Sequence, residues 1–366
     1  MAAARLTGHG GLDRLEYRTD VPVPEPGPGE VLIRVAAAGV NNTDVNTRTG
    51  WYSKSVRGDT GEGAAGGIDG VDPGDSSWSG GAIRFPRIQG ADCAGRIVAV
   101  GQGVAASRLG ERAIVRSLLR APVDFRPHEC HTLGAERDGG FAEFCAAPAA
   151  DTFAVDAELS DVELGAVPCA YSTAEGLLVR AGVGAADRVL VTGASGGVGA
   201  AAVQLARIRG AEVIAVCSDA KAEAVRALGA DATIGREADP ADALGPGSVS
   251  VVVDLVGGPG WPRLLDALAR GGRYACAGAI AGPIVELDLR TLYLRDLSLL
   301  GSTVQADAVL PNLVRHLESG ALRPAVAATY PLSEIVAAQE RFLSKDFVGK
   351  LVLVPPSASE SPEPSS

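Results

Sequence analysis

The glycines around residue 196 have the clearest chemical meaning in the sequence. Residues 193–199 read Gly-Ala-Ser-Gly-Gly-Val-Gly, between an apolar run at 188–192 that predicts a buried strand and a run at 197–209 that predicts a helix. A glycine turn in this setting binds the pyrophosphate of a dinucleotide, because backbone N–H groups and the helix dipole attract negative charge. We expect Gly196 to admit the phosphate close to the backbone and Gly199 to let the helix pack on the strand.

This turn departs from the common pattern Gly-x-Gly-x-x-Gly at one position, where Ala194 replaces the first glycine. Gly193, directly before it, can still supply the tight turn. The predicted cofactor contacts within the turn are Ala194, Ser195, Gly196, Gly197, Val198 and Gly199. The alternative is a strand-to-helix turn that binds nothing, which the complete strand, turn and helix pattern disfavours.

The type of dinucleotide should depend on residues 217–221, which read Cys-Ser-Asp-Ala-Lys at the end of the next predicted strand. An NAD site normally has a carboxylate there for the ribose 2′-hydroxyl, whereas Cys217 is neutral. Ser218 can hydrogen-bond a 2′-phosphate and Lys221 can pair with it, so we expect NADPH. Asp219 carries the alternative, because it would disfavour the phosphate if it points inward instead of capping the following helix.

Roughly two domains must position these residues, judged from a length of 366 residues. The net charge of −11 argues against a nucleic-acid partner, since phosphate backbones need a positive surface. Six scattered Cys favour free thiols, and the first 16 residues lack an apolar secretion signal, so we expect a cytoplasmic protein. The uncharged run 189–206 reaches the length of a weak membrane span, but its central glycines predict a turn.

The apolar pattern changes its period along the chain. Runs at 31–36, 95–100, 111–115 and 141–145 predict a small β-barrel within residues 1–155. Strands and helices then alternate, at 188–192, 197–209, 212–217, 220–228, 249–255, 272–277 and 297–301, with Gly210 and Gly229 ending the two helices. This alternation predicts an α/β protein with a doubly wound parallel sheet over residues 156–302. We expect residues 303–354 to return to the first domain and residues 355–366 to form a disordered tail.

These features together resemble the medium-chain dehydrogenase/reductase superfamily, most closely its zinc-independent quinone oxidoreductase and enoyl reductase branch. The resemblance covers about residues 15–354. It rests on the glycine turn and on Pro-Gly-Glu-Val-Leu-Ile-Arg-Val (28–35), Gly-Val-Asn-Asn-Thr-Asp (39–44), Gly-Ala-Asp-Cys-Ala-Gly (90–95), Pro-Cys-Ala-Tyr-Ser-Thr-Ala (168–174) and Gly-Lys-Leu-Val-Leu (349–353). It implies a GroES-like barrel catalytic domain, a Rossmann domain, an active site between them, and a homodimer or homotetramer.

The comparison with that superfamily also predicts that no metal is bound. Zinc-dependent members carry a Cys where this chain has Asn41 and a Gly-His-Glu where it has Gly90-Ala91-Asp92, and of these ligands only Cys169 is retained. Asn and Ala cannot supply the N, S or carboxylate ligands of a tetrahedral zinc ion. Residues 128–131 read His-Glu-Cys-His, but adjacent side chains cannot all turn to one ion, so a polar loop is favoured.

Without zinc, the resemblance implies hydride transfer from NADPH to an enone, a quinone or an enoyl thioester, with a proton donor nearby. Residues 41–52 are similar to the Asn-x-x-Asp pattern and following Tyr of enoyl thioester reductases, which makes Tyr52 the candidate proton donor. The alternative is a packed Tyr whose hydroxyl is satisfied elsewhere. Asn41 and Asn42 are candidate amide donors to the substrate or nicotinamide, and Asp44 is expected to accept hydrogen bonds that fix the loop.

Further residues should lie beside the cofactor. Thr173 resembles the position next to the nicotinamide ring, and Val256, Gly278 and Ser302 follow later strands at the same crevice. The alternative for these residues is ordinary turn chemistry. Cys169 is expected to be a small buried hydrophobe.

A long segment of low periodicity, residues 53–87, follows directly on Tyr52. It contains nine glycines and five acidic residues. Segments of this length without regular structure are usually binding loops, lids or disordered insertions. We weigh a solvated insertion equally against a lid or a contact with a partner.

The sequence therefore predicts a small-molecule oxidoreductase that is NADPH-dependent and zinc-independent. One alternative is a cofactor-binding protein without a net redox step, such as a cyclase, an isomerase or a non-catalytic partner, because fold does not fix function. Alcohol oxidation is a third reading, and it would need the zinc.

The first testable prediction concerns that metal. Purified protein should contain no stoichiometric zinc, and a chelator should leave its activity unchanged, because Asn41 and Ala91 stand at ligand positions. Elemental analysis by mass spectrometry measures the zinc content. One tightly held zinc per chain would contradict the prediction.

Overall fold

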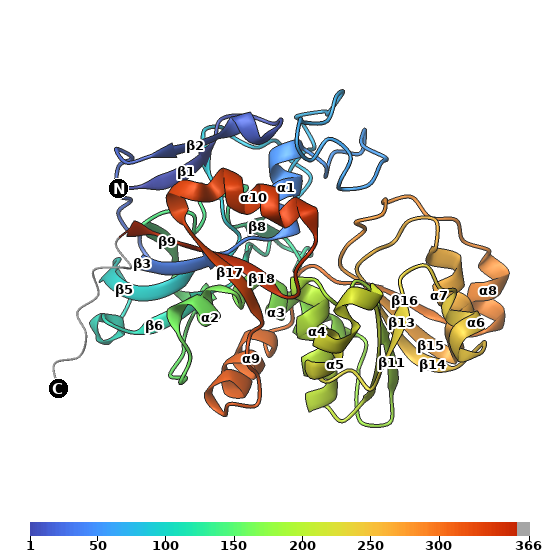
Figure 1. Cartoon of the computed structure of the whole chain (residues 1–366). Helices are drawn as coiled ribbons and strands as arrows, with labels where there is room; N and C mark the ends of the chain where they lie inside the picture. Colours follow the sequence, from blue (N-terminus) through green and yellow to red (C-terminus); the bar gives the residue numbers. More distant parts are fainter. Residues whose placement is uncertain (357–366) are drawn as a thin grey trace.

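The computed structural model describes residues 1–356, and it has two lobes with helix α3 between them (Figure 1). The first lobe holds a seven-stranded sheet in the order β10-β6-β5-β3-β18-β17, with β9 paired to β3. A three-stranded sheet, β2-β1-β4, and the hairpin β7-β8 complete it. These strands are β1 (Ala3–Leu6), β2 (Leu15–Arg18), β3 (Glu30–Gly39), β4 (Arg87–Ile88), β5 (Ala94–Val100), β6 (Arg112–Val115), β7 (Leu118–Arg120), β8 (Cys130–Thr132), β9 (Phe144–Pro148), β10 (Thr152–Ala154), β17 (Val326–Pro331) and β18 (Lys350–Val354).

The second lobe is a six-stranded parallel sheet in the order β13-β12-β11-β14-β15-β16. Its strands are β11 (Arg188–Val191), β12 (Glu212–Cys217), β13 (Ala232–Gly235), β14 (Val249–Asp254), β15 (Leu268–Cys276) and β16 (Ser298–Gly301). The helices of the chain are α1 (Asn42–Thr49), α2 (Asp161–Gly165), α3 (Pro168–Arg180), α4 (Gly197–Ile208), α5 (Ala222–Ala227), α6 (Pro240–Leu244), α7 (Trp261–Ala267), α8 (Leu289–Leu294), α9 (Val309–Glu318) and α10 (Ile335–Ser344).

Both faces of the parallel sheet are buried, which explains its unbroken apolar strands. Val189 and Val191 of β11 pack into one core cluster with α3, α4 and α9, whereas Leu190 between them packs with Trp261 and α7 on the opposite face. Side chains alternate along a strand, so a sheet covered on both faces needs apolar residues at every position. The predicted α/β class, a GroES-like barrel domain with a doubly wound Rossmann sheet, is confirmed.

The C-terminal part of the chain completes the first lobe. Strand β18 pairs antiparallel with β3, where Val352 lies opposite Gly39, and parallel with β17. The proposed boundaries after residues 155 and 302 remain predictions. The predicted disordered tail covers residues 355–366, and from residue 357 onward it lies outside the described part of the chain.

Some predicted elements differ from the observed ones. The strand predicted at 141–145 exists but is shifted: it is β9 (Phe144–Pro148), because the Phe141 backbone bonds to Gln89 and Ala4 instead of to β3. The helix predicted at 220–228 is a 3₁₀ turn, Asp219–Lys221, followed by α5. The predicted left-handed glycine ends are confirmed, with φ of 81° at Gly210 and 113° at Gly229.

The glycine-rich segment, residues 53–87, has no helix or strand before β4 begins at Arg87, yet it is attached to both lobes. The fully buried Arg48 of α1 donates to the Ala64 carbonyl (2.7 Å). Ser79 donates from its backbone and its hydroxyl to Glu136 Oε1. On the other side, the Thr60 N–H donates to the Ile280 carbonyl (3.1 Å), in the loop after β15 of the parallel sheet.

Candidate active site

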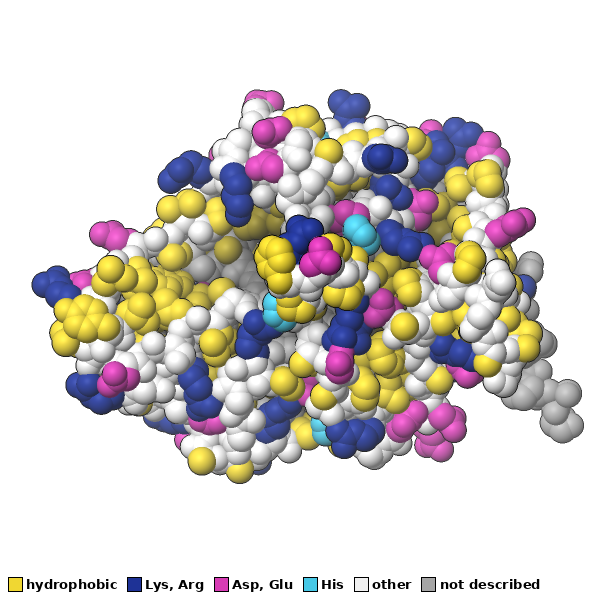
Figure 2. Space-filling view, turned by 180° about the vertical axis from the view of Figure 1, so that it is seen from behind, with side chains coloured by type: hydrophobic (Ala, Val, Ile, Leu, Met, Phe, Trp, Pro, Cys, Tyr) yellow, Lys and Arg dark blue, Asp and Glu magenta, His cyan; other side chains and the backbone are white. Residues whose placement is uncertain are grey.

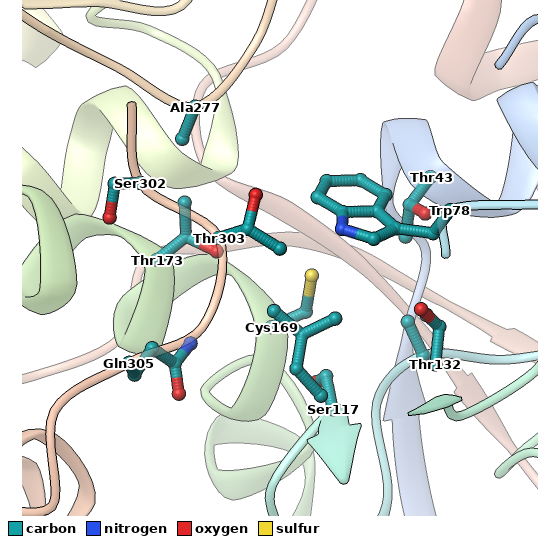
Figure 3. Close-up of a pocket in the computed structure, with 12 residues that line it drawn as sticks. Thr43, Trp78, Ser117, Thr132, Cys169, Thr173, Ala277, Ser302, Thr303 and Gln305 are labelled. Atoms are coloured by element: carbon teal, nitrogen blue, oxygen red, sulfur yellow. The ribbon is translucent and has the colours of Figure 1, made fainter. Parts of the chain in front are cut away.

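A small pocket lies where the two lobes meet α3 (Figure 3). Its volume is about 20 Å³, room for one or two water molecules. It is lined by uncharged residues from both lobes: Thr43, Trp78, Ala91, Ser117, Leu118, Thr132, Cys169, Thr173, Ala277, Ser302, Thr303 and Gln305. Trp78 brings the glycine-rich segment into the wall.

The glycine turn joins β11 to α4, at the edge of the sheet where the parallel strands end. A side chain at Gly199 would place its Cβ 2.2 Å from the Gly193 carbonyl, so only glycine lets α4 pack this closely on β11. Gly196 is exposed and directly precedes α4. The first hydrogen bond of the helix runs from the Ala200 N–H to the Gly196 carbonyl (2.8 Å). The N–H groups of the first turn of α4 therefore face outward, and the site fits a pyrophosphate.

The strands that flank this turn leave a crevice at the same edge. The order changes direction between β11 and β14, which is where doubly wound sheets bind dinucleotides. Val256 follows β14 and approaches Gly193, since a Cβ added at Gly193 would lie 3.4 Å from Val256 Cγ2. Gly278 follows β15, and Ser302 follows β16 and lines the pocket.

A buried ion pair connects the glycine turn to the barrel. Lys350 Nζ donates to Asp92 Oδ2 (3.0 Å), to the Val40 carbonyl (3.0 Å) and to Asn41 Oδ1, which uses all three of its hydrogens. The side chains of Lys350 and Asp92 are 2% and 0% exposed. The stem of Lys350 also packs beneath the turn, because a Cβ at Gly197 would lie 2.6 Å from Lys350 Cδ.

Asp92 gathers the remaining partners. Its Oδ2 accepts the Asn41 side-chain amide (2.8 Å), and its Oδ1 accepts the backbone N–H of Cys169 at the start of α3 (2.5 Å). Asn41, predicted as a donor to the substrate, therefore has its amide bound to Asp92 and Lys350, and it is not part of the pocket lining. Among residues 1–356, no group of three or more His, Cys, Asp or Glu side chains is placed to hold a metal ion.

Asp44 accepts hydrogen bonds that fix the loop at Asn41, as expected. It accepts the N–H groups of Asn41 (2.8 Å) and Ala91 (3.0 Å) and is 3% exposed. Burial raises the pKa of this carboxyl to about 7, and the nearby carboxylate of Asp92 adds to the effect. The Asn42 side chain instead bonds Asn46 of the next helical turn (3.2 Å), away from the pocket lining.

Tyr52 lies one hydrogen bond behind the pocket. Its hydroxyl donates to Thr43 Oγ1 (2.9 Å), and its ring meets Trp78 edge-on with centroids 4.8 Å apart. Thr43 and Trp78 both line the pocket, whereas Tyr52 does not. Burial raises the pKa of the Tyr52 phenol above its ordinary value. Because Thr43 accepts from Tyr52, its own hydrogen is left to donate into the pocket.

Cys169 differs from its prediction as a buried hydrophobe. Its side chain lines the pocket in Figure 3, and burial raises the pKa of the thiol, so that it is protonated at neutral pH. Thr173, one helical turn further along α3, also lines the pocket. Helix α3 begins at Pro168, so Thr173 lies within its second turn.

The other end of the crevice is a second, open cavity at the end of β12. It is lined by Cys217, Asp219, Ala222, Glu223, Arg226, Thr233 and Ile234. Arg226 donates to Thr233 Oγ1 (2.8 Å), and Lys221 Nζ donates to the Lys345 carbonyl. Asp219 belongs to this lining, and the predicted phosphate ligand Lys221 lies beside it.

Sequence reasoning missed several lining residues. Thr43 lies within residues 39–44, on which the family resemblance partly rests. Its hydroxyl could have marked it as a hydrogen-bond donor to the substrate. Trp78, Ser117, Thr132 and Gln305 come from loops or strands far apart in the chain, and Arg226 comes from helix α5, so no spacing rule connects them.

Known proteins match this chain along its length. Residues 27–157 match the alcohol dehydrogenase GroES-like domain, and residues 197–319 match the zinc-binding dehydrogenase family. An acryloyl-coenzyme A reductase from Metallosphaera sedula is 30% identical over 96% of this chain and 99% of its own. A quinone oxidoreductase from Lama guanicoe is 29% identical over 97% of both chains.

Solved structures agree with these matches. A putative alcohol dehydrogenase from Sinorhizobium meliloti is 46% identical, with a TM-score of 0.85, covering 97% of this chain and 96% of its own. A mycobacterial protein in complex with NADPH is 28% identical, with a TM-score of 0.75, covering 97% of this chain and 100% of its own.

The barrel, the doubly wound sheet and the glycine turn between them define an oxidoreductase that uses a nicotinamide cofactor on a small-molecule substrate. The chain belongs to the medium-chain dehydrogenase/reductase superfamily, in its quinone oxidoreductase and enoyl reductase-like branch. Among residues 1–356 the structure contains no helix long and apolar enough to cross a membrane.

A second prediction tests the buried ion pair. Lys350→Met should lower the free energy of unfolding by about 3–5 kcal/mol, because it leaves the Asp92 carboxylate buried without its cation. Denaturant unfolding measures the change, with Lys54→Met at an exposed position as the matched control. The double variant Asp92→Asn/Lys350→Met should lose less than the sum of the single losses. Additive losses would mean that the two groups do not depend on each other.

Proposed function

We propose that this protein is an NADPH-dependent, zinc-independent reductase of small α,β-unsaturated carbonyl compounds or quinones. The observation that carries the proposal is the pocket at the nicotinamide end of the crevice, which has a free hydroxyl donor, Thr43, and no charged side chain in its lining. A neutral donor suits a carbonyl oxygen on which negative charge develops. The relatives named as an acryloyl-coenzyme A reductase and a quinone oxidoreductase support this class of substrate.

The nicotinamide cofactor, when bound, supplies a hydride to the substrate. The chain provides the rest of the site: the turn at Gly196 and Gly199 for the pyrophosphate, and Thr173 and Ser302 beside the nicotinamide end. Thr43 would donate to the substrate oxygen and hold a proton there. Tyr52 is then a positioning residue, because its hydroxyl donates to Thr43 Oγ1 and leaves the Thr43 hydrogen free for the substrate oxygen.

Zinc-independence is supported by the charge of the site. At the family's zinc position, Asn41 is engaged by the Lys350 ammonium, and a second cation beside it would be repelled. Alcohol oxidation is the second candidate, because a putative alcohol dehydrogenase is 46% identical to this chain. The zinc content predicted above separates the two.

The choice of NADPH rests on the cavity at the end of β12. Cys217 is neutral there, and Arg226 lines the cavity and supplies a cation for a 2′-phosphate. Lys221 would supply a second cation once its ammonium leaves the Lys345 carbonyl. Asp219 and Glu223 oppose them. The related mycobacterial structure with NADPH supports this choice.

The proposal includes assembly into a homodimer or homotetramer in the cytoplasm. Strand β16 is the edge of the parallel sheet, and exposed apolar side chains surround it, including Leu289, Tyr293, Leu294 and Leu299. Figure 2 shows hydrophobic side chains gathered at the left, over the lobe that carries α8 and β16. Such a patch favours an interface between copies. The six free cysteines are consistent with a reducing compartment.

A third prediction tests the catalytic assignment. With an enone that the protein reduces, Tyr52→Phe should lower kcat at least about tenfold, a low bound for the loss of a correctly oriented hydrogen-bond donor at Thr43. NADPH affinity should stay nearly constant, because the ring still packs on Trp78. Tyr17→Phe is the matched control on β2.

Thr43→Val distinguishes positioning from a purely structural role. Its kcat should fall at least as far as that of Tyr52→Phe, and adding Tyr52→Phe to it should change little, because the two hydroxyls act in series. Additive losses, or an unchanged kcat in Tyr52→Phe, would mean that the proton arrives by another route.

A fourth prediction concerns the cofactor. NADPH should bind at least about tenfold tighter than NADH, a difference of about 1.4 kcal/mol. Arg226→Ala and Lys221→Ala should each reduce this preference, and Lys54→Ala should not, because Lys54 is exposed in the other lobe. Isothermal titration calorimetry with both nucleotides measures the ratio. Equal affinities in the unmodified protein would show that Asp219 dominates this cavity.

A further inference from the structure

The barrel side of the pocket contains a buried hydroxyl without a partner. Thr132 Oγ1 makes no hydrogen bond within residues 1–356, although the residue is only 2% exposed. Figure 3 shows Thr132 on the same side of the pocket as Thr43 and Trp78. Unpartnered buried polar groups cost stability, so a hydroxyl kept in this state in a pocket wall indicates that a ligand binds there.

The main chain of Thr132 is held in place by Glu136. Glu136 Oε2 accepts the Thr132 N–H (2.7 Å), and Glu136 Oε1 accepts the backbone N–H (3.1 Å) and the hydroxyl (2.6 Å) of Ser79. Burial opposes the charge of this carboxyl, but hydrogen bonds from Ser79, Ser77 and Thr132 outweigh it and lower the pKa. One ionised side chain therefore fixes both Thr132 and the neighbour of Trp78 in the pocket wall.

Two hydroxyls on this side of the pocket are free to donate. Tyr52 donates to Thr43 Oγ1 (2.9 Å), which leaves the Thr43 hydrogen for the pocket, and the Thr132 hydrogen has no acceptor in the described part of the chain. A carbonyl oxygen has two lone pairs and can accept from both hydroxyls. The pair therefore suits the oxygen that the proposed function places at Thr43.

The other polar groups of the lining do not offer this combination. Gln305 Oε1 lies on the opposite side of the pocket and can only accept, while Gln305 Nε2 donates to Ser172 (2.6 Å). The Ser117 hydroxyl interacts with the Cys169 thiol. Thr132 is the lining residue with an unused donor on the side of Thr43.

We propose that Thr132 is a second catalytic residue, whose hydroxyl binds the carbonyl oxygen of the substrate together with the hydroxyl of Thr43. This inference rests on the proposed reductase function and deepens it. When a hydride adds to the β-carbon of an enone, a C–H bond forms and the electron pair of the C=C bond moves toward the carbonyl. Negative charge then stays on the oxygen until the α-carbon takes a proton from water. Two neutral donors fixed at this oxygen stabilise the charge in a lining that contains no cation.

Removal of the Thr132 hydroxyl tests the contact, with methyl vinyl ketone as the enone and NADPH at saturation. Thr132→Val should lower kcat/KM at least about tenfold, a low bound for the loss of one such donor. NADPH affinity should stay constant, and the melting temperature should stay the same or rise, because the deleted hydroxyl has no partner.

Two further variants control for packing. Thr132→Ser retains the hydroxyl and should recover most of the activity, whereas Thr329→Val, the same change as Thr132→Val at an exposed position of β17, should have no effect. An unchanged kcat/KM in Thr132→Val would overturn the proposal. So would an equal loss in Thr132→Ser, because that result would show that the side chain acts through its shape.

Double variants separate a direct contact from an effect transmitted through Thr43. Tyr52 and Thr43 act in series, whereas Thr132 and Thr43 should act in parallel on one oxygen. Thr43→Val/Thr132→Val should therefore have a kcat/KM at least about tenfold below that of Thr43→Val alone. If Thr132→Val costs nothing further in the Thr43→Val protein, Thr132 does not touch the substrate and the proposal is overturned.

The carbonyl band of a bound ketone separates failure of this pair from failure of the reductase. Butanone, the reduction product of methyl vinyl ketone, is labelled at the carbonyl and added with NADP⁺, and its band is measured by infrared difference spectroscopy. Hydrogen bonds to the oxygen lower the stretching frequency, so Thr132→Val and Thr43→Val should each raise it, and Thr329→Val should not. If methyl vinyl ketone is not reduced but the band moves in both variants, the reductase proposal fails and the pair stands. A band that Thr132→Val leaves unaltered, or no band of bound ketone, overturns the pair.

Discussion

The Asp92 carboxylate is the group on which the architecture of the site depends. It binds the Asn41 amide at the start of α1, the Cys169 N–H at the start of α3 and the Lys350 ammonium at the start of β18. Three segments that are far apart in sequence are thereby fixed around one buried ion pair, Asp92 and Lys350. Because both charges are almost without solvent, each needs the other: an unpaired charge at this depth would cost several kcal/mol. The floor of the pocket and the base of the glycine turn are consequently parts of one rigid unit.

In this site of dehydrogenase type, the Lys350 side chain takes the organising role that a zinc ion has in zinc-dependent members of the family. The family's zinc ligands would be at Asn41, Ala91 and Cys169, and here the positive charge in contact with Asn41 belongs to Lys350. An ammonium with all three hydrogens in use cannot polarise a substrate. In the proposed mechanism, neutral donors stabilise the charge on the substrate, and the pocket offers Thr43, oriented by Tyr52, for this role. A site that relies on neutral donors also accounts for the absence of charged side chains from the pocket lining.

The glycine-rich segment gives the pocket its individual shape. It supplies Trp78, it is attached to the barrel through Arg48 and Glu136, and it reaches the parallel sheet through Thr60. These contacts argue against a freely solvated insertion, and the role of the segment as a lid stays a prediction. Trp78 forms part of the wall of the pocket, whose volume is about 20 Å³.

The sequence by itself determined the fold class, the glycine turn and most of the strands of the parallel sheet, because these depend on local periodicity and on glycine conformations that few other residues adopt. It also identified Asn41, Thr173 and Ser302 as residues near the site. The roles were decided by tertiary structure: Asn41 turned out to be bound to Asp92, and Tyr52 to be separated from the pocket by Thr43. Strand β9 was misplaced because Phe141 bonds to Gln89 and Ala4, which are distant in sequence. Trp78, Ser117, Thr132 and Gln305 come to line one pocket only after the lobes have formed, and no local pattern encodes the proximity of segments so far apart in the chain.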